Sequence, residues 1–174
     1  MCVCAVVVVG CSRPVADRER GATTAHSSDR SATASAAPRF AFYTVDHYDP
    51  KRIAADDLTM TLKRANQEHK RVLVQVGGDW CGWGKRMSQF IETNEPVRAA
   101  VEKNFLIMKV TKDDEQPNEA FLSQYPKINA YPHLFVLDSD GTVLHSQDTA
   151  PLEDGPGYSE KVYLEFLDKW KGAG

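Results

Sequence analysis

The sequence predicts an α/β fold, a three-layer α/β/α sandwich built around a mixed central sheet. Two short apolar runs, at residues 71–76 and 105–110, indicate buried strands, and helical patterns alternate with them along the chain. A hairpin pattern follows at residues 133–145. Helices that alternate with parallel strands cover both faces of a sheet, and an added antiparallel hairpin makes the sheet mixed. A chain of 174 residues has room for one such domain with a sizeable core.

The composition is that of a globular protein without a nucleic-acid partner. Apolar residues make up 42% and charged residues 26% of the chain, as in ordinary globular domains. The formal net charge is -3, so the chain has no broad positive field to hold nucleic acid. It contains no phosphate loop, serine nucleophile elbow or paired-carboxylate motif, and we expect no cofactor.

The N-terminus, residues 1–11, resembles a bacterial lipoprotein signal. An apolar run from Val3 to Val9 is followed by Gly10 and Cys11, and the run is too short to span a bilayer as a helix. In such signals the cysteine is lipidated and becomes the mature N-terminus. The resemblance therefore implies a lipid-anchored protein of the bacterial cell envelope that faces the periplasm. The alternative is a cytoplasmic protein with a frayed apolar tail.

A tether and one folded domain are predicted to follow. From Ser12 to about Pro38 the chain is rich in Ala, Ser, Thr and Arg and has almost no large apolar side chain. Such a segment buries too little surface to offset the entropy lost on ordering. We predict a disordered tether over residues 12–45 and a single domain over residues 46–174.

The first half of the domain is predicted to contain a helix, a strand and two further helices. Asp56 or Asp57 can cap the first helix, and the strand at 71–76 follows it. Asn94 caps the third helical segment. The apolar faces of the first two helices consist of Leu58, Leu62 and Ala65 in one and of Met87, Phe90 and Ile91 in the other.

The second half is predicted to contain a strand at 105–110, a short helix, a hairpin and a final helix. Residues 117–124 can form the short helix, since proline is accepted in a first turn. Strands at 133–137 and 142–145 flank the sequence Asp-Ser-Asp-Gly, which indicates a hairpin turn. Ser159 caps the final helix. The buried side of that helix consists of Val162, Tyr163, Phe166, Leu167 and Trp170.

The segment GGDWCGWGKRM lies where the first buried strand gives way to a helix, and it carries a resemblance to a known family. It resembles the Trp-Cys-x-x-Cys-Lys motif of the thioredoxin superfamily, which opens the same helix. The matching residues are Trp80, Cys81, Gly82, Trp83 and Lys85, with Gly84 in place of the second cysteine. Tyr131-Pro132, before the strand HLFVL, corresponds to the cis proline of that family. The resemblance covers about residues 71–170 and implies a thioredoxin-like fold.

Cys81 is the candidate catalytic residue. A cysteine in the first turn of a helix faces unpaired N–H groups and the positive end of the helix dipole, which both favour thiolate. Lys85 and Arg86 add positive charge nearby, although Asp79 opposes them. We expect the Cys81 thiol to be more acidic than that of a free cysteine. The alternative is an inert buried cysteine that packs as a small apolar side chain.

Gly84 removes the second thiol that a dithiol cycle needs. A dithiol enzyme leaves its mixed disulfide when the second cysteine attacks, and a glycine cannot do so. If Cys11 is lipidated and Cys2 and Cys4 leave with the signal, Cys81 is the only free thiol of the mature chain. Any disulfide at Cys81 then involves another molecule. Gln75 stands where classical thioredoxins carry a buried acid, which agrees weakly with this interpretation.

The residues around Cys81 are expected to form a groove. In the family, the cis bond before the proline presents neighbouring backbone to substrate, so Tyr131 and Pro132 are expected to offer an edge to an extended peptide. The alternative is a plain turn proline. By resemblance to the family, Trp80 is expected in the core, and Trp83 is then the exposed tryptophan at the rim.

The histidines do not indicate a metal site. The chain has five, scattered without the spacing of zinc ligands. His133 and His145 lie on the predicted hairpin, where a cross-strand pair is a better interpretation than a metal centre. We therefore expect no bound metal.

Three functions agree with the sequence. The first is thiol-disulfide exchange by Cys81 alone, with protein or small-molecule thiols and disulfides as partners and an external thiol to resolve the adduct. The second is a non-catalytic module that binds a peptide or a protein in the groove. The third is an oxidoreductase that takes its second cysteine from another protein or from an unprocessed N-terminal segment. A cysteine retained at a helix start favours the first.

Overall fold

The computed structural model describes residues 38–113 and 118–172. The lipoprotein signal predicted at residues 1–11, with Cys11, and residues 12–37 of the predicted tether lie outside the described residues. None of the described helices is both long and apolar enough to cross a membrane. The elements are β1 (Tyr43–Val45), α1 (Ala54–Glu68), β2 (Arg71–Gly77), α2 (Gly82–Thr93), α3 (Glu95–Asn104), β3 (Phe105–Thr111), α4 (Glu119–Leu122), β4 (His133–Leu137), β5 (Val143–Asp148), a single 3₁₀ turn (Ala150–Leu152), β6 (Glu153–Asp154), β7 (Gly157–Tyr158) and α5 (Glu160–Trp170).

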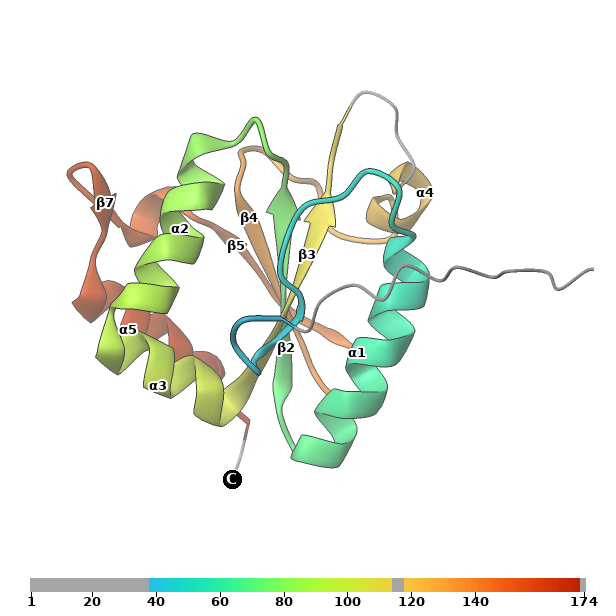
Figure 1. Cartoon of the computed structure of the whole chain (residues 1–174), viewed down its shortest axis with the longest axis horizontal. Helices are drawn as coiled ribbons and strands as arrows, with labels where there is room; N and C mark the ends of the chain where they lie inside the picture. The colour runs from blue at the N-terminus through green and yellow to red at the C-terminus, as the bar shows by residue number, and fades with distance from the viewer. Residues whose placement is uncertain (1–37, 114–117, 173–174) are drawn as a thin grey trace, which may run out of the picture. The chain divides into compact units, whose positions relative to one another are not determined.

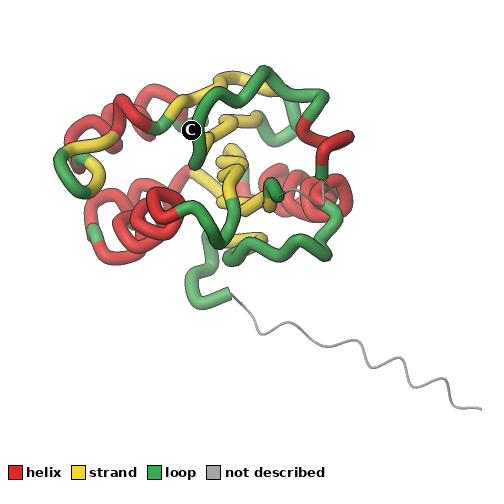
Figure 2. Tube along the Cα trace, turned by 90° about the horizontal axis from the view of Figure 1, so that it is seen from above, coloured by secondary structure: helices red, strands yellow, loops and turns green. Residues whose placement is uncertain are grey.

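Five strands form the central sheet, in the order β1-β3-β2-β4-β5. β1 and β2 run parallel to β3, whereas β4 pairs antiparallel with β2 and with β5. Helices α2, α3 and α5 lie on one face, and α1 and α4 lie on the other (Figure 1). Figure 2 shows the strands between these two groups of helices. The predicted three-layer sandwich with a mixed sheet is confirmed.

Each face of the sheet has its own apolar core. Alternate residues of a strand point to opposite faces, so Leu73 belongs to the core under α2, α3 and α5, whereas Val74 belongs to the core under α1 and α4. β2, β3 and β4 are buried along nearly their whole length. This burial on both faces explains why they read as continuous apolar runs in the sequence.

The folded domain begins earlier than predicted. Residues 38–45 were assigned to the tether, but Tyr43–Val45 forms β1 and pairs with β3. α1 begins at Ala54 rather than at Asp56 or Asp57, which lie in its first turn. Its cap comes from a distant residue, because the Ala54 N–H donates to the Asn118 Oδ1 at 2.9 Å. A side chain 64 residues away replaces the local cap that the pattern indicated.

The later elements agree well with the sequence. The Val97 N–H donates to the Asn94 side chain at 3.1 Å, and the Val162 N–H donates to the Ser159 hydroxyl at 3.5 Å, so both predicted caps are confirmed. The hairpin β4–β5 is also confirmed. The short hairpin β6–β7, which packs beside α2 in Figure 1, was not predicted.

Candidate functional site

Cys81 is the N-cap residue of α2, directly after the loop that leaves β2. Its sulfur accepts a hydrogen bond from the Gly84 N–H at 3.4 Å, and its own N–H donates to the Gly78 carbonyl at 2.9 Å. The sulfur therefore lies at the positive end of the helix dipole. The residue is only 4% exposed, and it is the one cysteine within residues 38–113 and 118–172.

A buried polar layer lies beneath this first turn. The Gln75 Nε2 donates to the Tyr48 hydroxyl oxygen at 2.9 Å and to the Gly84 carbonyl at 3.3 Å, while its Oε1 has no partner in the structure. Burial raises the pKa of Tyr48 well above its usual range, so the phenol stays neutral. Gln75 was noted in the sequence, but Tyr48 was not, because it comes from the loop before α1.

A buried lysine adjoins this layer. The Lys109 ammonium donates to the Asp46 carbonyl at 2.6 Å and lies over the rings of Tyr43 and Tyr48, at 4.9 and 5.7 Å from their centres. Burial lowers the pKa of Lys109, and nearby carboxylates oppose that change. A single lysine inside the apolar run FLIMKV was the sequence signal that could have indicated it.

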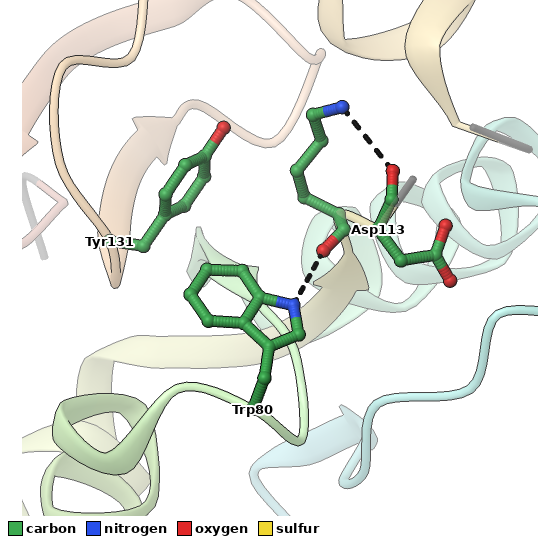
Figure 3. Close-up of a pocket in the computed structure, with 4 residues that line it drawn as sticks. Trp80, Asp113 and Tyr131 are labelled. Atoms are coloured by element: carbon green, nitrogen blue, oxygen red, sulfur yellow. Dashed lines mark hydrogen bonds between the residues drawn. The ribbon is translucent and has the colours of Figure 1, made fainter. Parts of the chain in front are cut away.

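A cavity next to the loop of Cys81, called the open side below, is lined by Trp80, Lys112, Asp113 and Tyr131. Trp80 is 59% exposed, and its indole N–H donates to the Lys112 carbonyl at 3.0 Å. Its ring meets the Tyr131 ring edge-on, with centroids 5.5 Å apart. Figure 3 shows these side chains. The cavity that they line has a volume of about 340 Å³. Cys81 itself does not line this cavity.

An aromatic cluster on α2, called the closed side below, consists of Trp83, Phe90 and Tyr158. Trp83 is half-buried and meets the Tyr158 ring edge-on at 5.7 Å. The Tyr158 hydroxyl donates to the Trp83 carbonyl at 3.3 Å. The prediction that Trp83 is exposed and Trp80 belongs to the core is therefore wrong. Tyr158 of the unpredicted hairpin β6–β7 packs on Trp83, which explains why this ring is half-buried.

The cis proline is confirmed, since the Tyr131–Pro132 peptide bond is cis. Val76, near the end of β2, pairs with His133 at the start of β4. This pairing brings the loop of Cys81 and the cis-proline loop to the same edge of the sheet. The Thr149 hydroxyl donates to the Pro132 carbonyl at 2.8 Å.

The remaining predicted site residues, Gly82 and Lys85, are both exposed on the first turn of α2. Gly82 is exposed and has open space around it. Lys85 is exposed and lines a polar cavity of about 420 Å³ together with Tyr48, Asp79 and Lys109.

The histidines do not form the expected cross-strand pair. His133 faces Asp148 across the β4–β5 ladder, whereas His145 faces Val136. His145 stacks on Trp170 instead, with ring centroids 4.4 Å apart. In the part of the chain that the structure describes, no three His, Cys, Asp or Glu side chains gather as metal ligands would.

A cysteine N-cap after a parallel strand, with a cis proline at the same edge of a five-stranded mixed sheet, defines a thioredoxin fold. The family model described as thioredoxin-like matches residues 53–139, half of the chain, and the chain belongs to this family.

Similar solved structures agree with that fold. The disulphide isomerase from Xylella fastidiosa Temecula1 is 22% identical, with 70% of this chain and 94% of that chain covered and a TM-score of 0.60. The C-terminal domain of DsbD from Neisseria meningitidis, in its oxidised form, is 19% identical, with 72% and 98% covered and a TM-score of 0.50. No curated protein sequence matches the chain.

Proposed function

We propose that this protein carries out thiol-disulfide exchange through Cys81 alone, and that an external thiol completes the reaction. The observation that carries the proposal is the Cys81 sulfur at the N-cap of α2, where it accepts the Gly84 N–H. Membership of the thioredoxin-like family supports thiol-disulfide chemistry in general. The disulphide isomerase and the DsbD domain among the similar structures add to that support.

The reaction has two balanced steps. The Cys81 thiolate attacks one sulfur of a substrate disulfide R–S–S–R′, which forms Cys81–S–S–R and releases R′–S⁻. An external thiolate R″–S⁻ then attacks the sulfur of R, which forms R–S–S–R″ and releases the Cys81 thiolate. In sum, R′ is reduced to a free thiolate and the external thiol is oxidised into the disulfide R–S–S–R″, which a second external thiol can reduce in the same way. The protein returns to its starting state.

The first turn of α2 has room for a second cysteine, although the chain lacks one. A Cβ added to Gly84 would lie 3.6 Å from the Cys81 Cβ and 3.5 Å from its sulfur. Disulfides join Cβ atoms that are about 3.5–4.5 Å apart. Gly84→Cys is therefore expected to form a disulfide with Cys81 without backbone movement.

This geometry gives a direct test of the proposal. With glutathione as the external thiol, the wild-type chain should reduce β-hydroxyethyl disulfide. With only a dithiol reductase as electron source, it should not. Gly84→Cys should gain activity under the second condition, and Gly82→Cys, at an exposed position, is the matched control. Cys81→Ser should abolish all turnover. Glutathione-dependent turnover that survives in Cys81→Ser would refute the proposal.

The cellular location is part of the proposal. The sequence Val-Val-Gly-Cys that ends at Cys11 supports a lipid anchor and a periplasm-facing domain. Cys11→Ser should move the protein from the membrane fraction to the soluble fraction of a bacterial host, while Cys2→Ser should not. A wild-type chain found in the cytoplasm without lipid would favour the alternative location.

One observation favours a second candidate, a non-catalytic module that binds a peptide or a protein. Cys81 is 4% exposed, whereas the adjacent Trp80 is 59% exposed beside the cavity that Tyr131 lines. If binding is the function, partner capture should survive in Cys81→Ser and be lost in Trp80→Ala. If exchange is the function, Cys81→Ser should lose every covalently trapped partner.

A further inference from the structure

Lys109 is a buried charge without an acidic partner. The residue is 9% exposed, and its ammonium donates to the Asp46 carbonyl at 2.6 Å and lies over the rings of Tyr43 and Tyr48. It forms no ion pair with any carboxylate of residues 38–113 and 118–172. An ammonium group can donate three hydrogen bonds, and within those residues only the Asp46 carbonyl accepts one. A charge buried in this way costs stability unless its remaining donors are paired.

The cavity that Lys109 lines has room for the missing acceptor. Its volume is about 420 Å³, within the range of small-molecule sites. A single water takes up only about 30 Å³, so the space exceeds what solvation of one ammonium needs. The walls come from the loop before α1, which contributes Tyr48, from α2 and from β3, which contributes Lys109. A ligand with an anionic oxygen therefore fits beside the ammonium.

The walls of this cavity carry charges of both signs. The charged side chains that line it are Arg39, Lys85 and Lys109, which are positive, and Asp46, Asp79 and Glu92, which are negative. The Tyr43 hydroxyl donates to the Glu92 Oε1 at 3.2 Å, which holds that carboxylate in place. A ligand with only a negative charge is repelled by the three acids, and one with only a positive charge is repelled by Lys109. A ligand that carries both charges suits both sets of side chains.

We propose that this cavity binds a small zwitterion, a free α-amino acid, whose carboxylate accepts from the Lys109 ammonium and whose ammonium pairs with Asp79 and Glu92. The hydroxyl and amide groups that also line the cavity, on Ser88, Gln89 and Thr93, favour an amino acid with a short polar side chain. The site shares no lining residue with the cavity on the open side, and Cys81 lines neither. Binding here is therefore independent of the proposed exchange reaction.

Binding is measured on the full chain with no thiol or disulfide present, so the result does not depend on that reaction. The probe is L-serine. Its matched compounds are 3-hydroxypropionate, which lacks the ammonium, and ethanolamine, which lacks the carboxylate. A titration followed by the backbone amide NMR signals gives an affinity for each compound and locates the residues affected. We expect L-serine to bind at least about tenfold more tightly than either compound, with shifts at residues 46–48, 88–93 and 109.

Two variants test the two ends of the ligand. Lys109→Met keeps a long side chain without the charge, and it should weaken L-serine binding by at least about tenfold. Lys63→Met, on the exposed side of α1, is the matched control and should leave the affinity unchanged. Glu92→Gln keeps an oxygen for Tyr43 and should weaken L-serine binding by about threefold or more, without weakening the binding of 3-hydroxypropionate. Near-UV circular dichroism shows whether each variant is folded.

The outcomes also separate this proposal from the proposed function. A folded wild-type chain whose cavity residues do not respond to L-serine would overturn the amino-acid site, and so would equal affinities for the three compounds. A folded Lys109→Met variant that binds L-serine as the wild type does would overturn it as well. If Lys109→Met does not fold, Glu92→Gln is judged by the same criterion. A chain that binds L-serine as described but lacks glutathione-dependent turnover would refute the exchange function and leave this site supported.

Discussion

The two tryptophans beside Cys81 occupy opposite environments, although they stand three residues apart. Trp80 projects from the open side and has one polar anchor, the Lys112 carbonyl. Trp83 packs into the closed side against Tyr158. Residue type and position in the motif do not explain this difference. The partner supplied by the rest of the fold decides which indole is buried.

The difference also separates two physical roles. On the open side, aromatic rings border a cavity and remain available for contact with a partner. On the closed side, similar rings join the core under α2 and α5. We therefore expect substitutions on the closed side to affect stability and those on the open side to affect binding.

The largest expected effect is the loss of the indole on the closed side. Trp83→Ala should destabilise the domain by about 3 kcal/mol, because it removes a half-buried ring from the core. Trp80→Ala should cost less than about 1 kcal/mol. Urea denaturation of both variants measures these values. Equal losses would show that the two sides do not differ as described.

The closed side should also respond to alkali. Burial raises the pKa of Tyr158 above that of an unfolded tyrosine. Its neutral phenol therefore contributes stability that is present below about pH 10 and is lost as the pH rises through the folded value. Tyr158→Phe should make that loss shallower by up to about 1.4 kcal/mol per pH unit. Tyr131→Phe, at a half-buried ring, should change the slope less. An unchanged slope in Tyr158→Phe would contradict the assignment.

Gly78 and Gly82, near the open side, differ in the space around them, and substitutions at these glycines should have smaller effects. A Cβ on Gly78 would lie 2.3 Å from the Trp80 Nε1, whereas a Cβ on Gly82 would meet nothing within 4 Å. Gly78→Ala should displace the indole from Lys112, shift the tryptophan fluorescence and cost about 1 kcal/mol. Gly82→Ala should be neutral or stabilise α2 by about 0.5 kcal/mol. Matching fluorescence in the two variants would argue against the Trp80 contact.

The smallest expected effect is the contribution of His133, the residue after the cis proline, to the loss of stability at low pH. Burial lowers the pKa of His133, an effect that Asp148 opposes and His145 supports. A lowered folded value means that the stability is present above about pH 6.5 and is lost as the pH falls. In His133→Gln, the free energy of unfolding should decrease less steeply as the pH falls. Urea denaturation at a series of pH values measures this slope. A variant that loses stability in acid as steeply as the wild type would exclude His133 as a source.

The parts of the fold that the sequence predicts well are those whose signal is local. Strands buried on both faces are mostly apolar, so the runs at 71–76, 105–110 and 133–137 could be recognised despite single polar residues such as Gln75 and Lys109. β1 has only three residues, and its assignment depends on pairing with β3. The prediction of the α1 cap was wrong because the cap also depends on a distant residue. Asn118 accepts a hydrogen bond from the Ala54 N–H, although it lies 64 residues away in the sequence.

In the candidate site, too, the sequence predicts the local features but not the contacts between distant residues. Cys81 at the helix start and Pro132 before β4 followed from short motifs that lie next to their own elements. Tyr48 reaches Gln75 from 27 residues away, and Tyr158 reaches Trp83 from 75 residues away. No local sequence pattern indicates contacts between residues so far apart in the sequence. The environments of both tryptophans therefore had to come from the structure.

The early strand β1 and the late helix α5 have a practical consequence for how the domain can be isolated. Residues 53–139, which the family model matches, exclude β1, Tyr48, β5 and α5. A fragment with those bounds would leave Gln75 without its phenol partner and would uncover the sheet face that α5 shields. Such a fragment should aggregate on expression. A fragment of residues 38–172 keeps every one of these contacts and is the better unit for autonomous folding.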